Sequence, residues 1–273
     1  MATSAALVHS SAARAVTTGQ SPLQQLQSDL ITRASRNDYA AALELGMGYT
    51  CGHFGLTVNY DEARKYLRIA ALGAKEAGKN SQHWEIGQCA QSFATQYKTK
   101  LTETFVQEIF GGRVPKHIDN YDFGYNTTIE YIPARYLYAF NWFEVEKNAE
   151  KPELDQSELQ DVLNDVQLCV ANSFMPALAL SGLLHCKNII GSTDGVPNVE
   201  QGLTLLNRAA NEGGDAVAKM YLAEMYTGKH GVGKNLNEAK KWAEAAEEQK
   251  APGADALLRK INKERQRGKC TIL

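Results

Sequence analysis

The sequence predicts an all-α fold, an α/α solenoid in which helix–turn–helix units stack along the chain. Apolar and small residues recur at the spacing of one helix face near both ends of the sequence, and only seven prolines are present in 273 residues. One helix–turn–helix pattern also occurs three times. Such repetition is typical of stacked arrays, because a single helical pair cannot bury its apolar face alone.

The first copy of the pattern occupies residues 38–74. Ala41, Leu45 and Tyr49 are spaced i, i+4 and i+8, so they share one face of a helix. Gly46 lies beside the leucine, and its missing side chain is expected to let a second helix approach closely. A glycine-rich turn follows this helix, and the second helix is expected to begin after the turn.

Two further copies stand next to each other at 174–213 and 215–249. The distance from Ala177 to Ala218, the matching first alanines, is about one repeat length for arrays of helical pairs. Adjacent units at this period are what a stacked solenoid requires.

The second helix of each pair is expected to start at a short polar residue. Asp61 in the first copy and Asn237 in the last are the predicted N-caps. Small and aromatic residues then follow at helical spacing, namely Ala63, Tyr66 and Ala70 in the first copy and Ala239, Trp242 and Ala246 in the last.

These copies resemble the Sel1-like repeat family, a relative of the tetratricopeptide (TPR) repeats. The family pattern places an alanine, a Leu-Gly pair and a tyrosine on the first helix, then glycines, a polar start, an aromatic residue and a final Ala-Ala. The copy at 174–213 departs from it, with Ser181 in place of the leucine and His185 in place of the tyrosine. The resemblance covers a little under half of the chain, and it implies a TPR-like scaffold that assembles protein complexes.

The remaining parts of the chain are assigned around the three copies. We expect a disordered tail at 1–21, an array at 22–250 that is degenerate or interrupted by an insertion at 75–172, and a capping helix with a basic end at 251–268. Within the degenerate part we expect one or two helices over 79–110, a loop at 112–128, and helices at 131–148 and 157–172.

The composition limits which classes of binding partner and which cellular compartment we expect. The formal net charge of −2 argues against nucleic acid as a partner, and no apolar run approaches the roughly 20 residues that span a bilayer. Five separated cysteines without a secretory signal predict thiols in a reducing compartment. Residues 1–28 lack Asp and Glu, so a mitochondrial transit peptide is the alternative to a polar tail.

The chain ends in residues 269–273, Lys-Cys-Thr-Ile-Leu, which fit a CaaX box with Cys270 as the acceptor thiol for prenylation. The final leucine favours geranylgeranyl, and the ending resembles those of small GTPases and G-protein gamma subunits. Basic residues precede the motif, and those expected to meet an anionic membrane are Lys263, Arg265, Arg267 and Lys269.

No arrangement of residues points to catalysis, a cofactor or a metal. The six histidines do not combine with other ligands at metal spacing, and no phosphate-binding loop or nucleophile elbow is present. His53 and His230 lie in equivalent turns, which we interpret as a consequence of the repeat. The aromatic group of Tyr136, Tyr138, Phe140, Trp142 and Phe143 is interpreted as core, with a binding patch as the alternative.

The sequence therefore predicts a non-enzymatic adaptor. It would bind an unidentified protein in the groove of the array and be held on a cytosolic membrane face as a peripheral lipoprotein. Sel1-like repeats with a CaaX box resemble the architecture of fungal chitin synthase activators, which act on a membrane enzyme. The alternatives are a mitochondrial Sel1-type assembly factor and, as the third choice, a hydrolase-like enzyme.

Overall fold

The computed structural model describes residues 20–76, 82–110, 132–148, 156–190 and 198–270. The expected loop at 112–128, nearly all of the expected tail at 1–21 and the last three residues of the CaaX box lie outside these ranges.

Within the described ranges the protein is all-α and has no strand, in agreement with the predicted class. Neighbouring helices pack against each other, most extensively α2 with α3, α9 with α10 and α3 with α4, followed by α11 with α12. The elements are α1 (Pro22–Ala34), α2 (Tyr39–Cys51), the 3-10 turn η1 (His53–Gly55), α3 (Tyr60–Glu76), α4 (Gln82–Gln96), α5 (Lys98–Leu101), α6 (Glu103–Phe110), α7 (Ile132–Asn148), α8 (Gln156–Ala171), α9 (Met175–Cys186), α10 (Val199–Asn211), α11 (Ala216–Met225), α12 (Leu236–Glu248) and α13 (Ala254–Cys270).

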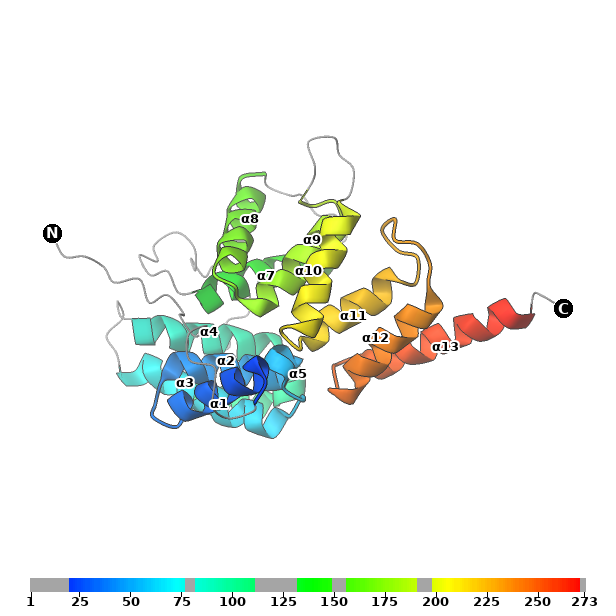
Figure 1. Cartoon of the computed structure of the whole chain (residues 1–273). Coiled ribbons are helices and arrows are strands. Elements are labelled where there is room, and N and C mark those ends of the chain that lie inside the picture. Colours follow the sequence, from blue (N-terminus) through cyan, green and yellow to red (C-terminus); the bar gives the residue numbers. More distant parts are fainter. Residues whose placement is uncertain (1–19, 77–81, 111–131, 149–155, 191–197, 271–273) are drawn as a thin grey trace.

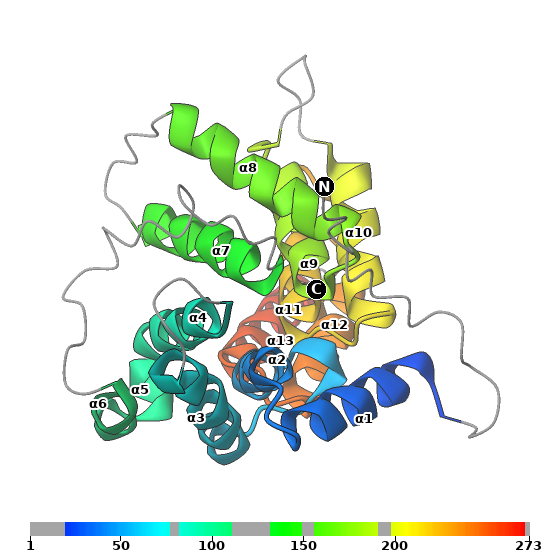
Figure 2. The ribbon, with the colours of Figure 1, turned by 90° about the vertical axis from the view of Figure 1, so that its left-hand side faces the viewer.

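The helices form three groups in space. Helices α1 to α6 lie together, α7 to α10 lie beside them, and α11 to α13 extend from the second group (Figure 1). In the side view, α7 and α8 lie above α3 to α6 (Figure 2). Helix α9 lies between the pair α7 and α8 and the C-terminal helices. The last helix therefore lies at one end of the molecule.

The second helix of each copy begins after an asparagine cap. Asn59 accepts hydrogen bonds from the backbone of the second and third residues after it, and Asn235 does the same before α12. Asn198 caps α10 through one such bond. The predicted caps Asp61 and Asn237 were wrong by two residues, because the preceding asparagines already take the free N–H groups of the first turn.

Replacing Asn59 by alanine is expected to lower the free energy of unfolding by about 1 kcal/mol, because two backbone N–H groups lose their acceptor. Asp61→Ala is the matched control and should cost at most about 0.5 kcal/mol, since this side chain is 88% exposed and pairs with Arg64 at the surface. Urea denaturation measures both. A larger loss for Asp61 would restore the original cap assignment.

Small residues set the distance between paired helices. A Cβ atom on Gly46 would lie 2.7 Å from the side chain of Leu67 on α3, so the predicted close approach is present. The contact is closer between α9 and α10. A Cβ on Gly202 would lie 2.4 Å from Sγ of Cys186 and 2.7 Å from the carbonyl oxygen of Gly182. The two backbones therefore touch at this crossing.

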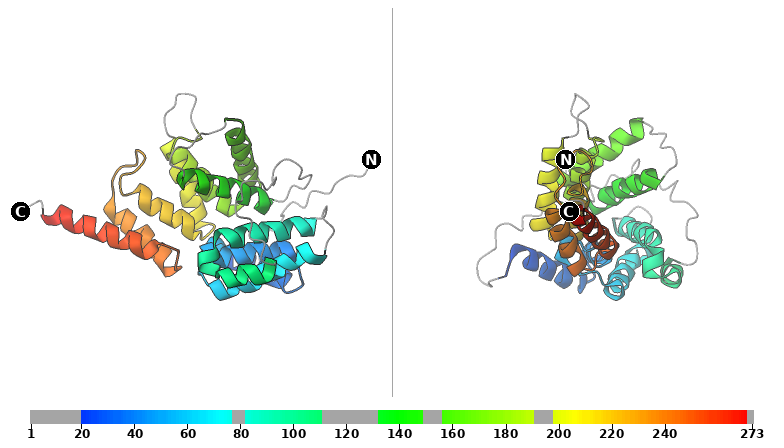
Figure 3. Two further views of the ribbon diagram at one scale, coloured as in Figure 1. Left: turned by 180° about the vertical axis from the view of Figure 1, so that it is seen from behind. Right: turned by 90° about the vertical axis from the view of Figure 1, so that its right-hand side faces the viewer.

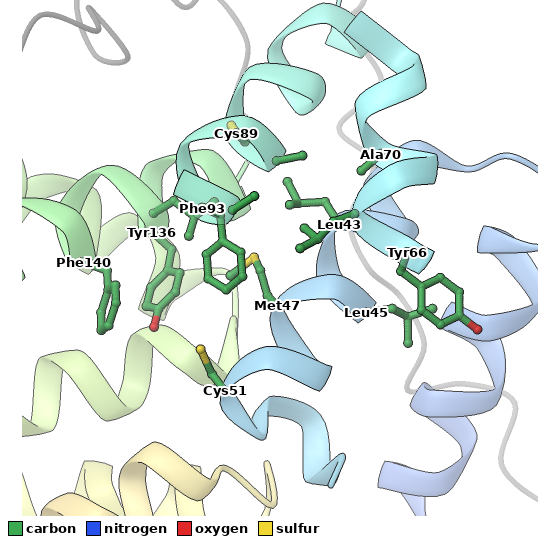
Figure 4. Close-up of a cluster of buried hydrophobic side chains, with 14 of the residues drawn as sticks. Leu43, Leu45, Met47, Cys51, Tyr66, Ala70, Cys89, Phe93, Tyr136 and Phe140 are labelled. Carbon is green, nitrogen blue, oxygen red and sulfur yellow. The ribbon is translucent and has the colours of Figure 1, made fainter. Parts of the chain in front are cut away.

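The core consists of two large apolar groups that share α9. In the first, Met47 of α2, Phe93 of α4 and Tyr136 of α7 converge between three helices (Figure 4). The second group fills the space between α9 and α13. Helix α9 contributes Leu180 to the first group and Leu183 to the second, so it links the two halves of the molecule.

The aromatic residues of α7 belong to this core, as interpreted from the sequence. Tyr136 and Phe140 are buried, and Trp142 and Phe143 are half-buried and packed against the first group. The side chain of Tyr138 lies outside the described part of the chain. The binding-patch alternative therefore has no support from the four described rings.

The middle of the chain differs from expectation in one place. The segment expected to hold one or two helices contains α4, the short α5 and α6. Thr102 separates α5 from α6 with a φ of +72°, which no continuous α-helix permits. Helices α7 and α8 each begin within one residue of the predicted start.

Candidate functional site

Helix α13 begins directly after Gly253, whose φ of +86° turns the chain. It therefore starts three residues after the predicted position and continues to Cys270. Ile261 is fully buried, and Leu257 and Leu258 are half-buried against the second apolar group, as expected for a capping helix. Beyond this contact the helix runs on past the rest of the molecule (Figure 3).

The side of α13 turned away from Ile261 is basic. Lys260, Lys263 and Arg267 are exposed, and their spacing of i, i+3 and i+7 places them along one stripe. We call these three residues the basic stripe. Arg259 lies beside it and forms a 2.8 Å ion pair with Asp255 one turn earlier.

The polar residues on the flanks of α13 are bound to neighbouring segments. Glu264 forms an ion pair with Lys234 in the turn before α12. Arg265 donates a 2.9 Å hydrogen bond to Oδ1 of Asn237 on α12. The ion pair with Lys234 neutralises the carboxylate of Glu264, which would otherwise weaken the positive potential of the stripe.

The residues that were expected to meet a membrane have different surroundings in the structure. Lys263 and Arg267 lie on the basic stripe, whereas the guanidinium of Arg265 is bound to α12. Lys260 joins the stripe although the sequence prediction did not select it. The side chains of Lys269 and Cys270 lie outside the described part of the chain, so only the helical backbone leading to them is known.

A second polar centre was missed by the sequence prediction, in the turn after α2. Ala216, at the start of α11, donates a 3.0 Å hydrogen bond to the carbonyl oxygen of Gly52. Val58 donates a 2.9 Å bond to the carbonyl oxygen of Gln249, just after α12. The side-chain amide of Gln249 donates to carbonyl oxygens on both sides of the contact, at 3.2 and 3.0 Å. We call this contact the junction.

A buried ion pair lies inside the junction. The Nδ1 atom of His53 is 2.7 Å from Oδ2 of Asp215, and the two residues are 162 positions apart in the sequence. The side chains are 3% and 0% exposed. The other oxygen of Asp215 accepts a 2.9 Å bond from the N–H of Ala218, so the same carboxylate caps α11. The ring of Tyr136 meets the imidazole edge-on.

This environment keeps the imidazole charged. Burial alone would lower the pKa of His53, but the charge and the hydrogen bond of Asp215, together with a smaller contribution from Cys51, outweigh it and raise this pKa to about 10. Burial is also the main reason that the pKa of neighbouring Tyr136 lies well above its usual value. His53 is therefore an imidazolium at neutral pH, held against a carboxylate.

Cys51, His53 and Asp215 follow the order of a nucleophile, a base and an orienting acid, but the arrangement does not suit catalysis. All three residues are buried, so no surface opening leads a substrate to the thiol of Cys51 or to the imidazole of His53. His53 and Asp215 form a buried ion pair between the first and last helix pairs. The equivalent His230 is exposed in the last copy, so repeat position alone gave no signal of this role.

No group of three or more metal-binding side chains occurs among the described residues, and no described helix is long and apolar enough to cross a membrane. A shallow depression of about 370 Å³ lies at the outer edge of the junction, with Tyr49, Thr57 and Lys250 in its lining.

Comparison of the chain with protein-family models gave no match, and comparison with curated proteins gave none either. The likeness to Sel1-like repeats therefore stays a prediction from the residues.

Proposed function

We propose that this protein is a non-enzymatic scaffold, an α/α solenoid of Sel1-like helix pairs that binds a partner protein while a geranylgeranyl group on Cys270 tethers it to a cytosolic membrane face. The observation that carries the proposal is the form of α13. The helix buries one side against the array, presents the basic stripe on another side, and runs directly to the acceptor cysteine.

The energetics favour two signals acting together. One lipid chain gives only reversible attachment, so stable anchoring needs a second contribution. A basic residue close to an anionic leaflet contributes about 1 kcal/mol, so the three residues of the stripe supply on the order of 3 kcal/mol. From Lys260 to Cys270 the helix rises about 15 Å, so the stripe lies within reach of the surface that the lipid would enter.

The scaffold part of the proposal rests on the packed helix pairs. Long arrays of this kind present extended surfaces to other proteins, and the resemblance to Sel1-like repeats points to the same use. The C-terminal position of the tether puts it at the end of the molecule opposite α1 to α6 (Figure 1).

Cys270→Ser is expected to move the protein from the membrane fraction to the soluble fraction of a eukaryotic cell, because the acceptor thiol is lost. Leu273→Ser is the matched control. It keeps the thiol and changes the preferred lipid to farnesyl, so the protein should stay membrane-bound. Mass spectrometry of the wild type should show the lipid and the loss of residues 271–273. An unmodified full-length C-terminus from the native cell would refute the tether.

Reversing the charge of Lys260, Lys263 and Arg267 together is expected to weaken binding of the lipidated protein to vesicles containing phosphatidylserine by on the order of 100-fold. Binding to neutral phosphatidylcholine vesicles should not change. Reversal of Arg36, Lys98 and Lys100, which are exposed on α5 and after α1, is the control with the same change in net charge. Equal weakening by both triple variants would mean that total charge, not the stripe, attracts the membrane.

A further inference from the structure

The junction joins parts of the chain that stacking alone would keep apart. In an array of helical pairs each unit contacts its neighbours, and the end units unfold most easily. Here the turn after α2, in the first pair, contacts α11 and the end of α12, in the last pair. The two pairs therefore touch directly, although α7 and α9 also border this turn.

We propose that the junction is a clasp that locks the last helix pair, and with it α13, onto the first pair. The clasp consists of the His53–Asp215 ion pair, the backbone bonds between Gly52 and Ala216 and between Val58 and Gln249, and the side-chain amide of Gln249. It fixes the direction of α13 relative to the N-terminal pairs, whether or not Cys270 carries a lipid.

The backbones of the two segments lie in close contact across the junction. A Cβ atom on Gly52 would lie 2.6 Å from Cβ of Ala216, and one on Gly214 would lie 2.7 Å from Cα of Gly55. Real Cβ atoms do not come so near to other carbon atoms, so neither position accepts a side chain without a shift of the backbone. A loose surface contact would leave room for a methyl group.

The equivalent turn in the last pair supplies a comparison within the same chain. His230 there is exposed, and Gly233 has no atom within 4 Å of a Cβ position. His53 is buried because α11 and Tyr136 of α7 cover it, whereas His230 in the equivalent turn stays exposed. The bonds of the clasp are polar, so substitutions can break them without removing side chains from the two apolar groups. Those groups remain joined through α9.

Hydrogen–deuterium exchange of the full chain tests the clasp. Asp215→Asn keeps a capping side chain and removes the charge, whereas Gly214→Ala forces the two backbones apart. Both variants should speed amide exchange in 216–225 and 236–248 by at least about tenfold, while the core peptides 86–94 and 177–184 keep their protection.

Gly253→Ala controls for backbone strain. Its φ of +86° is at least as unfavourable for alanine as the φ of +59° at Gly214, but the nearest atom to a Cβ there is 3.9 Å away. It should leave exchange in α11 near that of the wild type. The clasp would be disproved by unchanged exchange in both junction variants, and equally by the same acceleration in every peptide, which would indicate only a general loss of stability.

Discussion

His53→Ala is expected to lower the free energy of unfolding by about 3–5 kcal/mol at pH 6, because it leaves the carboxylate of Asp215 buried without its cationic partner. Urea denaturation followed by circular dichroism measures the change. His230→Ala is the control from the equivalent turn, and it should stay within about 0.5 kcal/mol of the wild type because that side chain is exposed. Equal losses at the two positions would show that the turn matters and the ion pair does not.

The stabilising effect of this pair should also depend on pH in a defined direction. The pKa of His53 is near 6.5 in the unfolded chain and about 10 in the folded protein. A raised pKa of a base means that the folded state holds the proton more tightly, so the contribution is complete below pH 6.5 and is lost as the pH rises toward 10. The groups that face the pair are Cys51, Tyr136 and Lys219, from α2, α7 and α11.

The double variant His53→Gln/Asp215→Asn isolates this effect, because it has no titrating group at the junction pair. The free energy of unfolding of the wild type should fall relative to the double variant between pH 6.5 and 10. Buried Glu44, whose pKa burial raises to about 7, titrates in both proteins and therefore cancels in the difference. A difference that is constant with pH would mean that His53 is not charged in the folded state.

Gly202→Val is expected to lower the free energy of unfolding by about 2–3 kcal/mol through overpacking. Its Cβ would meet both Sγ of Cys186 and the carbonyl oxygen of Gly182, and the latter cannot rotate out of the way. The higher helix propensity of most residues relative to glycine, at most about 1 kcal/mol, is too small to reverse the sign. The first and last copies have Ala63 and Ala239 at the matching positions, so those helices already carry a methyl group there.

Thermal and urea denaturation of Gly202→Val should be compared with Gly233→Val, where a Cβ meets no atom within 4 Å. The control should remain within about 0.5 kcal/mol of the wild type. A Gly202 variant as stable as the control would mean that α9 and α10 are farther apart than described.

Several features of the fold could be predicted because they depend on short stretches of sequence. The starts of α7 and α8, the close approach at Gly46 and the buried side of α13 follow from residue spacing over one to four helical turns. The N-caps were predicted two residues late, since Asn59 and Asn235 precede polar residues that suit a cap equally well.

The residues of the candidate membrane site could also be predicted only in part from the sequence. Spacing along one helix is enough to place Lys263 and Arg267 opposite the apolar residues of α13, and the structure leaves both exposed. The engagement of Arg265 depends on Asn237 of another helix, so α13 by itself could not reveal it.

The amino-acid sequence by itself determined that the chain is helical and which residues of each helix are apolar, because the hydrogen bonds and side-chain spacing of a helix span only a few residues. Only the tertiary structure decided that His53 meets Asp215, 162 residues away. The distance in space between these two side chains depends on the packing angles of all the helices between them. Each of those angles depends on side chains from two helices at once. The histidine of this turn is buried in the first pair, where α11 and Tyr136 of α7 cover it, and exposed in the last pair.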